Sequence, residues 1–79
     1  MPKFHIYEFI ANGVERPAVV YVPDEMNATM EEIAAYVNKY FEAPTGETFI
    51  FPEGGNVQEL ELPMENVVQL LHTKHHYKP

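Results

Sequence analysis

The chain has 79 residues, of which 46% are hydrophobic, and a formal net charge of −7 from twelve acidic and five basic residues. A chain this short buries one small core, so we expect a single domain over residues 1–79. The absence of cysteine excludes disulfides, a thiolate nucleophile and Cys-based metal sites, and the shortage of Lys and Arg argues against nucleic-acid or anionic-membrane binding.

Residues 3–22 predict a β-hairpin. Aromatic and β-branched residues flank Asn12-Gly13, a dipeptide that suits a two-residue type I′ turn. This register places Glu8 opposite Pro17 in a non-hydrogen-bonded pair, so the missing N–H of the proline points away from its partner strand. We therefore expect a hairpin whose second strand lies at a sheet edge.

Residues 29–42 predict an amphipathic helix. Thr29 and Glu32 have the spacing of a capping box, and Pro44 cannot continue a helix. The apolar positions at helical spacing are Met30, Ile33, Ala34, Val37 and Phe41.

The second half of the chain predicts further strands. After a loop at 44–46, we expect a strand at 47–52, a turn at 53–56 and an alternating, half-exposed strand at 57–62. Residues 63–72 fit two structures. The favoured one is a short helical turn followed by a strand, and the alternative is a helix.

Two segments resemble ubiquitin. Residues 29–37, TMEEIAAYV, are similar to the start of the ubiquitin helix, and 49–51, FIF, followed by a glycine-containing turn, are similar to its third strand. The resemblance implies a ubiquitin-like superfamily member of bacterial or phage type, with an α+β, β-grasp-like ββαββ(β) fold. One helix would pack on a mixed sheet of four to five strands. The ending HHYKP departs from the terminal Gly-Gly of conjugated modifiers, which puts conjugation in doubt and leaves conjugation and non-covalent binding as open alternatives.

The resemblance also implies a small non-catalytic protein-interaction module, acting freely or as an accessory subunit. Its binding surface would lie on the sheet face away from the helix, centred on Ile50, and the predicted protein-binding residues are Ile50, Phe51 and His72. The alternative is an acidic phage-type inhibitor that blocks a basic or nucleic-acid-binding surface by charge mimicry. We expect a protein partner, no nucleic acid, no membrane and no cofactor, and we leave a homo-oligomer open.

An enzyme is not expected, because the chain has neither serine nor cysteine to place beside a histidine. Glu59 and Glu61 share one strand face, and we interpret them as solvated side chains. No apolar run approaches the ~20 residues that span a bilayer, and we expect a cytoplasmic protein.

Three histidines near the end of the chain are weak zinc-ligand candidates: His72, His75 and His76. On a strand, the first and third share a face and the second takes the other. No Asp or Glu follows them to orient an imidazole ring. We therefore expect no native metal site, and we interpret this segment as a solvated strand end or tail.

Overall fold

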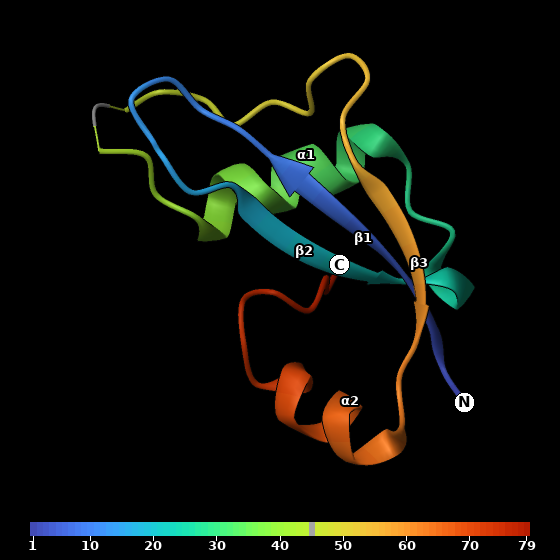
Figure 1. The fold of residues 1–79 in the computed structure, drawn as a ribbon. Helices are drawn as coiled ribbons and strands as arrows, with labels where there is room; N and C mark the ends of the chain where they lie inside the picture. Colours follow the sequence, from blue (N-terminus) through green and yellow to red (C-terminus); the bar gives the residue numbers. More distant parts are fainter. Residues whose placement is uncertain (45) are drawn as a thin grey trace.

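The computed structural model describes residues 1–44 and 46–79, so Thr45 of the predicted 44–46 loop lies outside the described residues. The strands form an antiparallel sheet in the order β2-β1-β3 (Figure 1). The elements are β1 (Lys3–Phe9), β2 (Ala18–Pro23), the 3-10 helix η1 (Asp24–Met26), α1 (Met30–Tyr40), β3 (Val57–Glu61) and α2 (Met64–Leu71).

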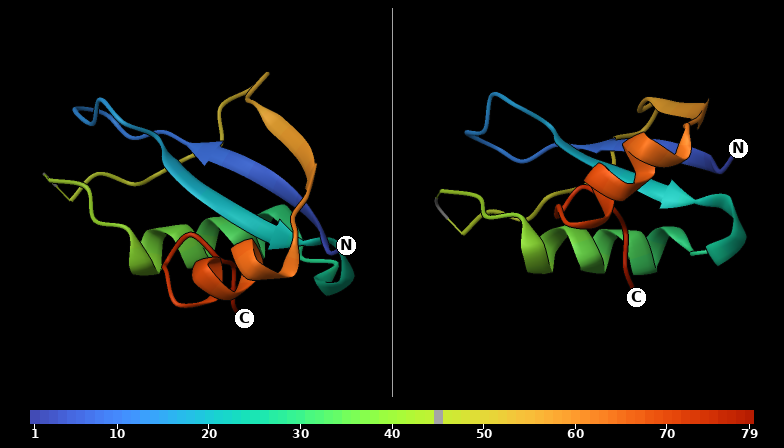
Figure 2. Two further views of the ribbon diagram at one scale, coloured as in Figure 1. Left: turned by 60° about the horizontal axis from the view of Figure 1, so that its bottom comes forward. Right: turned by 90° about the horizontal axis from the view of Figure 1, so that it is seen from below.

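The predicted first helix is confirmed as α1, which lies along one face of the sheet (Figure 2). The Glu32 N–H donates to Thr29 Oγ1 at 3.2 Å and the Thr29 N–H donates to Glu32 Oε1 at 2.9 Å, which completes the capping box. Its buried side chains pack with Phe9 and Val20, both 0% exposed, in the main core. The helix ends at Tyr40 rather than at residue 42.

The α+β class is confirmed, but the finer architecture is wrong. The described residues contain a three-stranded sheet and two α-helices, whereas the β-grasp-like ββαββ(β) fold requires one helix on a mixed sheet of four to five strands. Both ladders of the sheet are antiparallel. The difference arises because two segments predicted as strands, 47–52 and the end of 63–72, do not join the sheet as strands.

The hairpin forms with its turn at Asn12-Gly13 as predicted, where the Val14 N–H donates to the Ala11 carbonyl at 3.2 Å, but with a different turn type and strand register. Glu8 lies opposite Val19 and not Pro17, which falls in the connection between the strands. A type I′ turn needs positive φ at both central residues, but only Gly13, at 77°, has it. Positive φ at the second central residue alone is what a type II turn requires. The pairing differs from the predicted register by two residues, so the side chains that share a face of the sheet are the same in both registers.

Residues 47–52 do not form the predicted strand, because the pairing at Ile50 cannot continue in either direction: Pro52 has no N–H to donate, and Asn12 lies in the hairpin turn. Asn38 of α1 takes the backbone hydrogen bonds of Phe49, which point away from the paired segment. The Phe49 N–H donates to Asn38 Oδ1 at 2.7 Å, and Asn38 Nδ2 donates to the Phe49 carbonyl at 3.0 Å. The next residue, Ile50, makes one isolated antiparallel bridge to Ile10. The segment is therefore fixed by a helix side chain and a single bridge.

The predicted turn at 53–56 and the strand that follows it are confirmed. The Gly55 N–H donates to the Pro52 carbonyl at 2.9 Å, and Gly54 adopts a φ of 74°. The strand is β3, which pairs with β1 and is exposed at all five residues, more than the predicted half-exposed pattern.

The favoured strand within 63–72 is wrong, and the alternative helix is correct. The Pro63 carbonyl accepts hydrogen bonds from the N–H groups of Asn66 and Val67, which starts α2. One residue of α2, Val67, is buried, at 7% exposure. Within the described residues, neither α-helix is long and apolar enough to cross a membrane.

Candidate protein-binding surfaces

The histidine-rich segment after α2 is a docked tail and not the solvated end that we expected. It returns to the outer edge of β2 (Figure 1), where Tyr21 donates its N–H to the His75 carbonyl and accepts from the Tyr77 N–H at 2.8 Å. His76 and Tyr77 are 5% and 4% exposed. The tail therefore covers one edge of the sheet.

Side chains fix the tail in this position. The hydroxyl of Tyr36 lies 2.8 Å from the His76 carbonyl oxygen and 3.0 Å from that of Lys74. The Nδ1–H of His75 donates to the Val19 carbonyl at 2.7 Å. These contacts join α1, β2 and the tail into one packed unit.

The three weak metal candidates are not gathered around one point. His72 is exposed at the end of α2, His75 uses Nδ1 to bond β2, and the ring of His76 packs edge-to-face on Phe4 with centroids 5.8 Å apart. In the described part of the chain, no group of three or more His, Cys, Asp or Glu residues could hold a metal ion.

The predicted binding residues Ile50 and Phe51 lie together at the end of the sheet that carries the β1–β2 loop. Ile10 and Ile50 exchange two backbone hydrogen bonds, at 2.8 and 2.7 Å, and their side chains are 45% and 55% exposed. We call these two residues the Ile10–Ile50 patch. Phe51 is partly buried and packs its ring edge-to-face against Tyr7 and Phe9.

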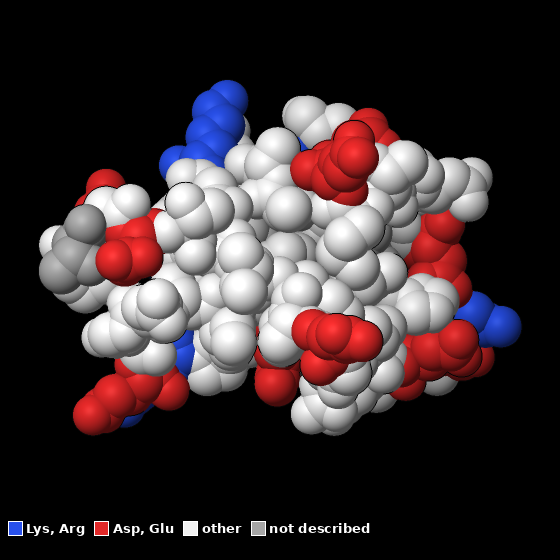
Figure 3. All heavy atoms as spheres, turned by 90° about the horizontal axis from the view of Figure 1, so that it is seen from above, with Lys and Arg blue, Asp and Glu red and all other residues white. Residues whose placement is uncertain are grey.

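The patch lines the same shallow hollow as Ala11, Asn12, Thr48 and the acidic Glu47. Figure 3 views the molecule from the side that carries the 47–56 segment and shows a broad uncharged area with both acidic and basic side chains around its border. His72, the third predicted binding residue, follows α2, which lies at the opposite end of the molecule in Figure 1. The structure therefore brings two of the three predicted residues together and leaves His72 apart.

The outer edge of β3 is a feature that the sequence did not reveal. Just beyond β3, the Leu62 N–H donates to the Pro2 carbonyl at 3.0 Å. Because bonded and non-bonded pairs alternate along an antiparallel ladder, the backbone groups of Leu60 and Gln58 also point toward β1. The residues whose backbone N–H and C=O groups point away from the sheet are Val57, Glu59 and Glu61.

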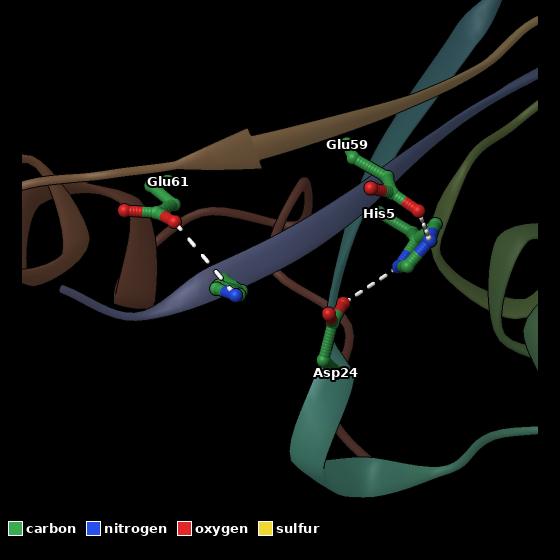
Figure 4. A network of polar contacts seen from close by, with 5 residues as sticks. His5, Asp24, Glu59 and Glu61 are labelled. Atoms are coloured by element: carbon green, nitrogen blue, oxygen red, sulfur yellow. Dashed lines mark hydrogen bonds and ion pairs between the residues drawn. The ribbon is translucent and has the colours of Figure 1, made fainter.

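A polar network crosses the sheet next to this edge (Figure 4). The His5 ring lies between two carboxylates, with Nδ1 at 2.6 Å from Asp24 Oδ1 and Nε2 at 3.0 Å from Glu59 Oε1. Hydrogen bonding to Asp24 is the main cause that raises the pKa of His5, which favours an imidazolium with both N–H groups donating. The contact ties β1 to η1 and β3. Asp24 and Glu59 lie 19 and 54 residues from His5 along the chain, so no local sequence pattern indicates this network.

A cleft of about 500 Å³ separates α2 from the start of β1 and from η1. Phe4 and Val67 contribute to its apolar lining, and His76 also lines it. The Nδ1 atom of His76 is buried without a hydrogen-bond partner. Burial, and then the positive charge of Lys78, lower the pKa of His76, so its ring is neutral at pH 7.

Comparison with known proteins found no match: no protein family, no curated protein and no solved structure matches the chain.

Proposed function

We propose that this protein is a small, non-catalytic protein-interaction module that binds a partner protein through the Ile10–Ile50 patch. One observation carries the proposal. Two large aliphatic side chains lie side by side, 45% and 55% exposed, on backbone that two reciprocal hydrogen bonds hold in place. Single exposed apolar residues are ordinary, but a fixed pair of exposed apolar side chains fits the apolar centre of an interface.

The charge of the chain supports a particular kind of partner. Acidic and basic side chains both border the uncharged area (Figure 3), but the chain as a whole carries a net charge of −7. The partner that fits is a protein with an apolar centre and a net basic charge. The proposal places this interaction in the cytoplasm, since a chain without cysteine needs no oxidising compartment to fold.

The test compares two substitutions with opposite expectations. Protein with Ile50→Asp and protein with Met64→Asp serve as baits, because Met64 is 59% exposed but lies on α2, away from the patch. A specific partner should be retained by the wild type and by Met64→Asp and should be lost by Ile50→Asp. Equal retention of the partner by both variants would refute the role of the patch in binding.

The affinity for the purified partner and the free energy of unfolding, both measured on Ile50→Ala, show whether Ile50 acts in binding or in the core. Ile50→Ala should weaken binding by more than about fivefold, the effect of a residue near an interface centre. It should lower the free energy of unfolding by less than ~1 kcal/mol, because Ile50 is 55% exposed, whereas truncating a buried Ile costs about 2–5 kcal/mol.

Salt separates this proposal from charge mimicry. Exposed charges are screened over ~10 Å at 0.1 M salt, so a binding mode based on acidic mimicry collapses as salt rises. Binding through the patch should persist at about 0.5 M NaCl with only a small loss of affinity. A complex that is lost under these conditions would favour the acidic inhibitor.

A further inference from the structure

We propose that the outer edge of β3 binds an extended basic segment of a partner protein, which adds to the sheet as a fourth strand. This inference goes beyond the proposed function, because it adds a second binding site, one for an extended basic segment. It rests on backbone geometry and side-chain charge at β3, not on the Ile10–Ile50 patch.

The first argument is that the edge is available. The outward backbone N–H and C=O groups of β3 belong to alternate residues, and all five residues of the strand are exposed. In the described part of the chain, β3 is the last strand of the sheet. Such an edge is a template for another strand, since main-chain hydrogen bonds provide the affinity.

The second argument is that the other edge of the sheet is already occupied. On β2, the outward groups of Tyr21 bond the tail, the Val19 carbonyl accepts from His75, and Pro23 has no N–H. A strand added to β2 would have to displace the buried part of the tail. Within the described residues, β3 therefore provides the accessible edge.

The third argument is charge. Glu59 and Glu61 project from one face of β3, with side chains 82% and 50% exposed (Figure 4). His5 and Lys3 approach these carboxylates from β1, at 3.0 and 3.9 Å, and leave the outer side to a partner. A Lys or Arg opposite each Glu would form a favourable cross-strand pair.

The residue between the two glutamates extends the pattern. Leu60 is 41% exposed and faces the other side of the sheet, so an apolar partner residue fits opposite it. The segment that matches the edge has a basic residue, an apolar residue and a basic residue in succession.

A second copy of this chain is a poor occupant. An antiparallel pair of β3 strands centred on Glu59 places this residue opposite its own copy, and an in-register parallel pair aligns every Glu with its copy. Like charges in such positions destabilise strand pairing. The acidic residues therefore act against self-association and favour a basic strand.

The experiment uses two capped peptides of equal length, one alternating Lys and Val and the other alternating Glu and Val. In an NMR titration of the full chain at 0.1 M salt, the basic peptide should shift amide signals of β3 and slow hydrogen exchange at its outward amides, those of Val57, Glu59 and Glu61. It should bind about tenfold more tightly than the acidic peptide, the combined effect expected from two charge pairs. Equal affinities, or shifts confined to β2 and the tail, would overturn the inference.

Two matched variants on the same strand test the backbone contact. Val57→Pro removes an outward N–H at the start of β3, where proline is tolerated, and keeps both carboxylates. Val57→Pro should lower the affinity for the basic peptide by about fivefold, the effect of losing one hydrogen bond. Gln58→Thr changes a residue whose backbone faces β1 and should bind as the wild type does. Equal binding by both variants would show that the peptide does not pair with the edge.

A third variant separates this inference from the proposed function. Ile50→Asp should bind the basic peptide with unchanged affinity. If no peptide binds while a natural partner still depends on Ile50, the strand-addition inference is wrong and the proposed function stands. If the peptide binds but no partner depends on Ile50, only the patch is wrong.

Discussion

Removing the hydroxyl of Tyr36 should loosen the tail and lower stability. Tyr36→Phe keeps the ring, which is 8% exposed and packs 5.1 Å from the ring of Tyr77, so the loss of packing is small. The substitution removes the partner of the His76 carbonyl, at 2.8 Å in a buried position, and of the partly buried Lys74 carbonyl, at 3.0 Å. Burial raises the pKa of Tyr36, so in the wild type the hydroxyl keeps its proton at neutral pH.

The expected cost follows from these contacts. Water can reach the Lys74 carbonyl once the hydroxyl is gone, but the His76 carbonyl stays buried and unpaired. A buried group without its hydrogen bond costs about 1–3 kcal/mol, and we expect Tyr36→Phe to lose this amount. In a domain of this size, each kcal/mol lowers the melting temperature by roughly 4–8 °C.

Urea denaturation measures the loss, and hydrogen exchange locates it. The Tyr77 amide, which bonds the Tyr21 carbonyl, should exchange faster in Tyr36→Phe. Tyr40→Phe is the matched control, because Tyr40 lies on the same helix and is 48% exposed. A Tyr36→Phe protein as stable as Tyr40→Phe, with unchanged protection of the Tyr77 amide, would refute the anchoring role.

Three further predictions concern other contacts. Thr29→Ala should lose about 0.5–2 kcal/mol in chemical denaturation, because it deletes the N-cap oxygen of α1. Asn38→Ala should lose about 1–3 kcal/mol and speed exchange of the Phe49 amide, whose N–H donates to the Asn38 side chain. The hydrogen bonds of His5, first of all to Asp24, raise its pKa above 6.5 in the folded protein. Their contribution to stability is therefore fully present below pH 6.5 and should disappear as pH rises through the raised pKa of the folded state. His5→Gln should remove that pH dependence from urea midpoints measured between about pH 5 and pH 9.

The parts of the fold that the sequence predicted are those set by neighbouring residues. The capping box of α1 joins positions three apart, and the turn at 53–56 depends on its own glycines. The exposure of Ile50 also follows from local alternation, with buried Phe49 and partly buried Phe51 on either side of it.

The incorrect predictions involve partners that are distant in sequence. In 47–52, only Ile50 pairs with another segment, at Ile10, and the backbone hydrogen bonds of Phe49 go to Asn38, eleven residues earlier. The apolar spacing of 63–72 fits both a helix and a strand, so the spacing alone could not separate the favoured strand from the helix that forms. The open edge of β3 and the His5 network were missed for the same reason, since neither is visible until the order of the strands is known.

The docked tail explains why the two edges of the sheet differ. A three-stranded sheet exposes two edges, and each is a hazard because any other strand can pair with it. At β2, the tail supplies the partner from within the chain, and burial of His76 and Tyr77 makes this cover part of the core. At β3, no such cover is present in the described residues, and alternating glutamates take its place. Charge repels an identical strand but attracts one of opposite sign, so this protection is selective, whereas the tail blocks every competitor that cannot displace it.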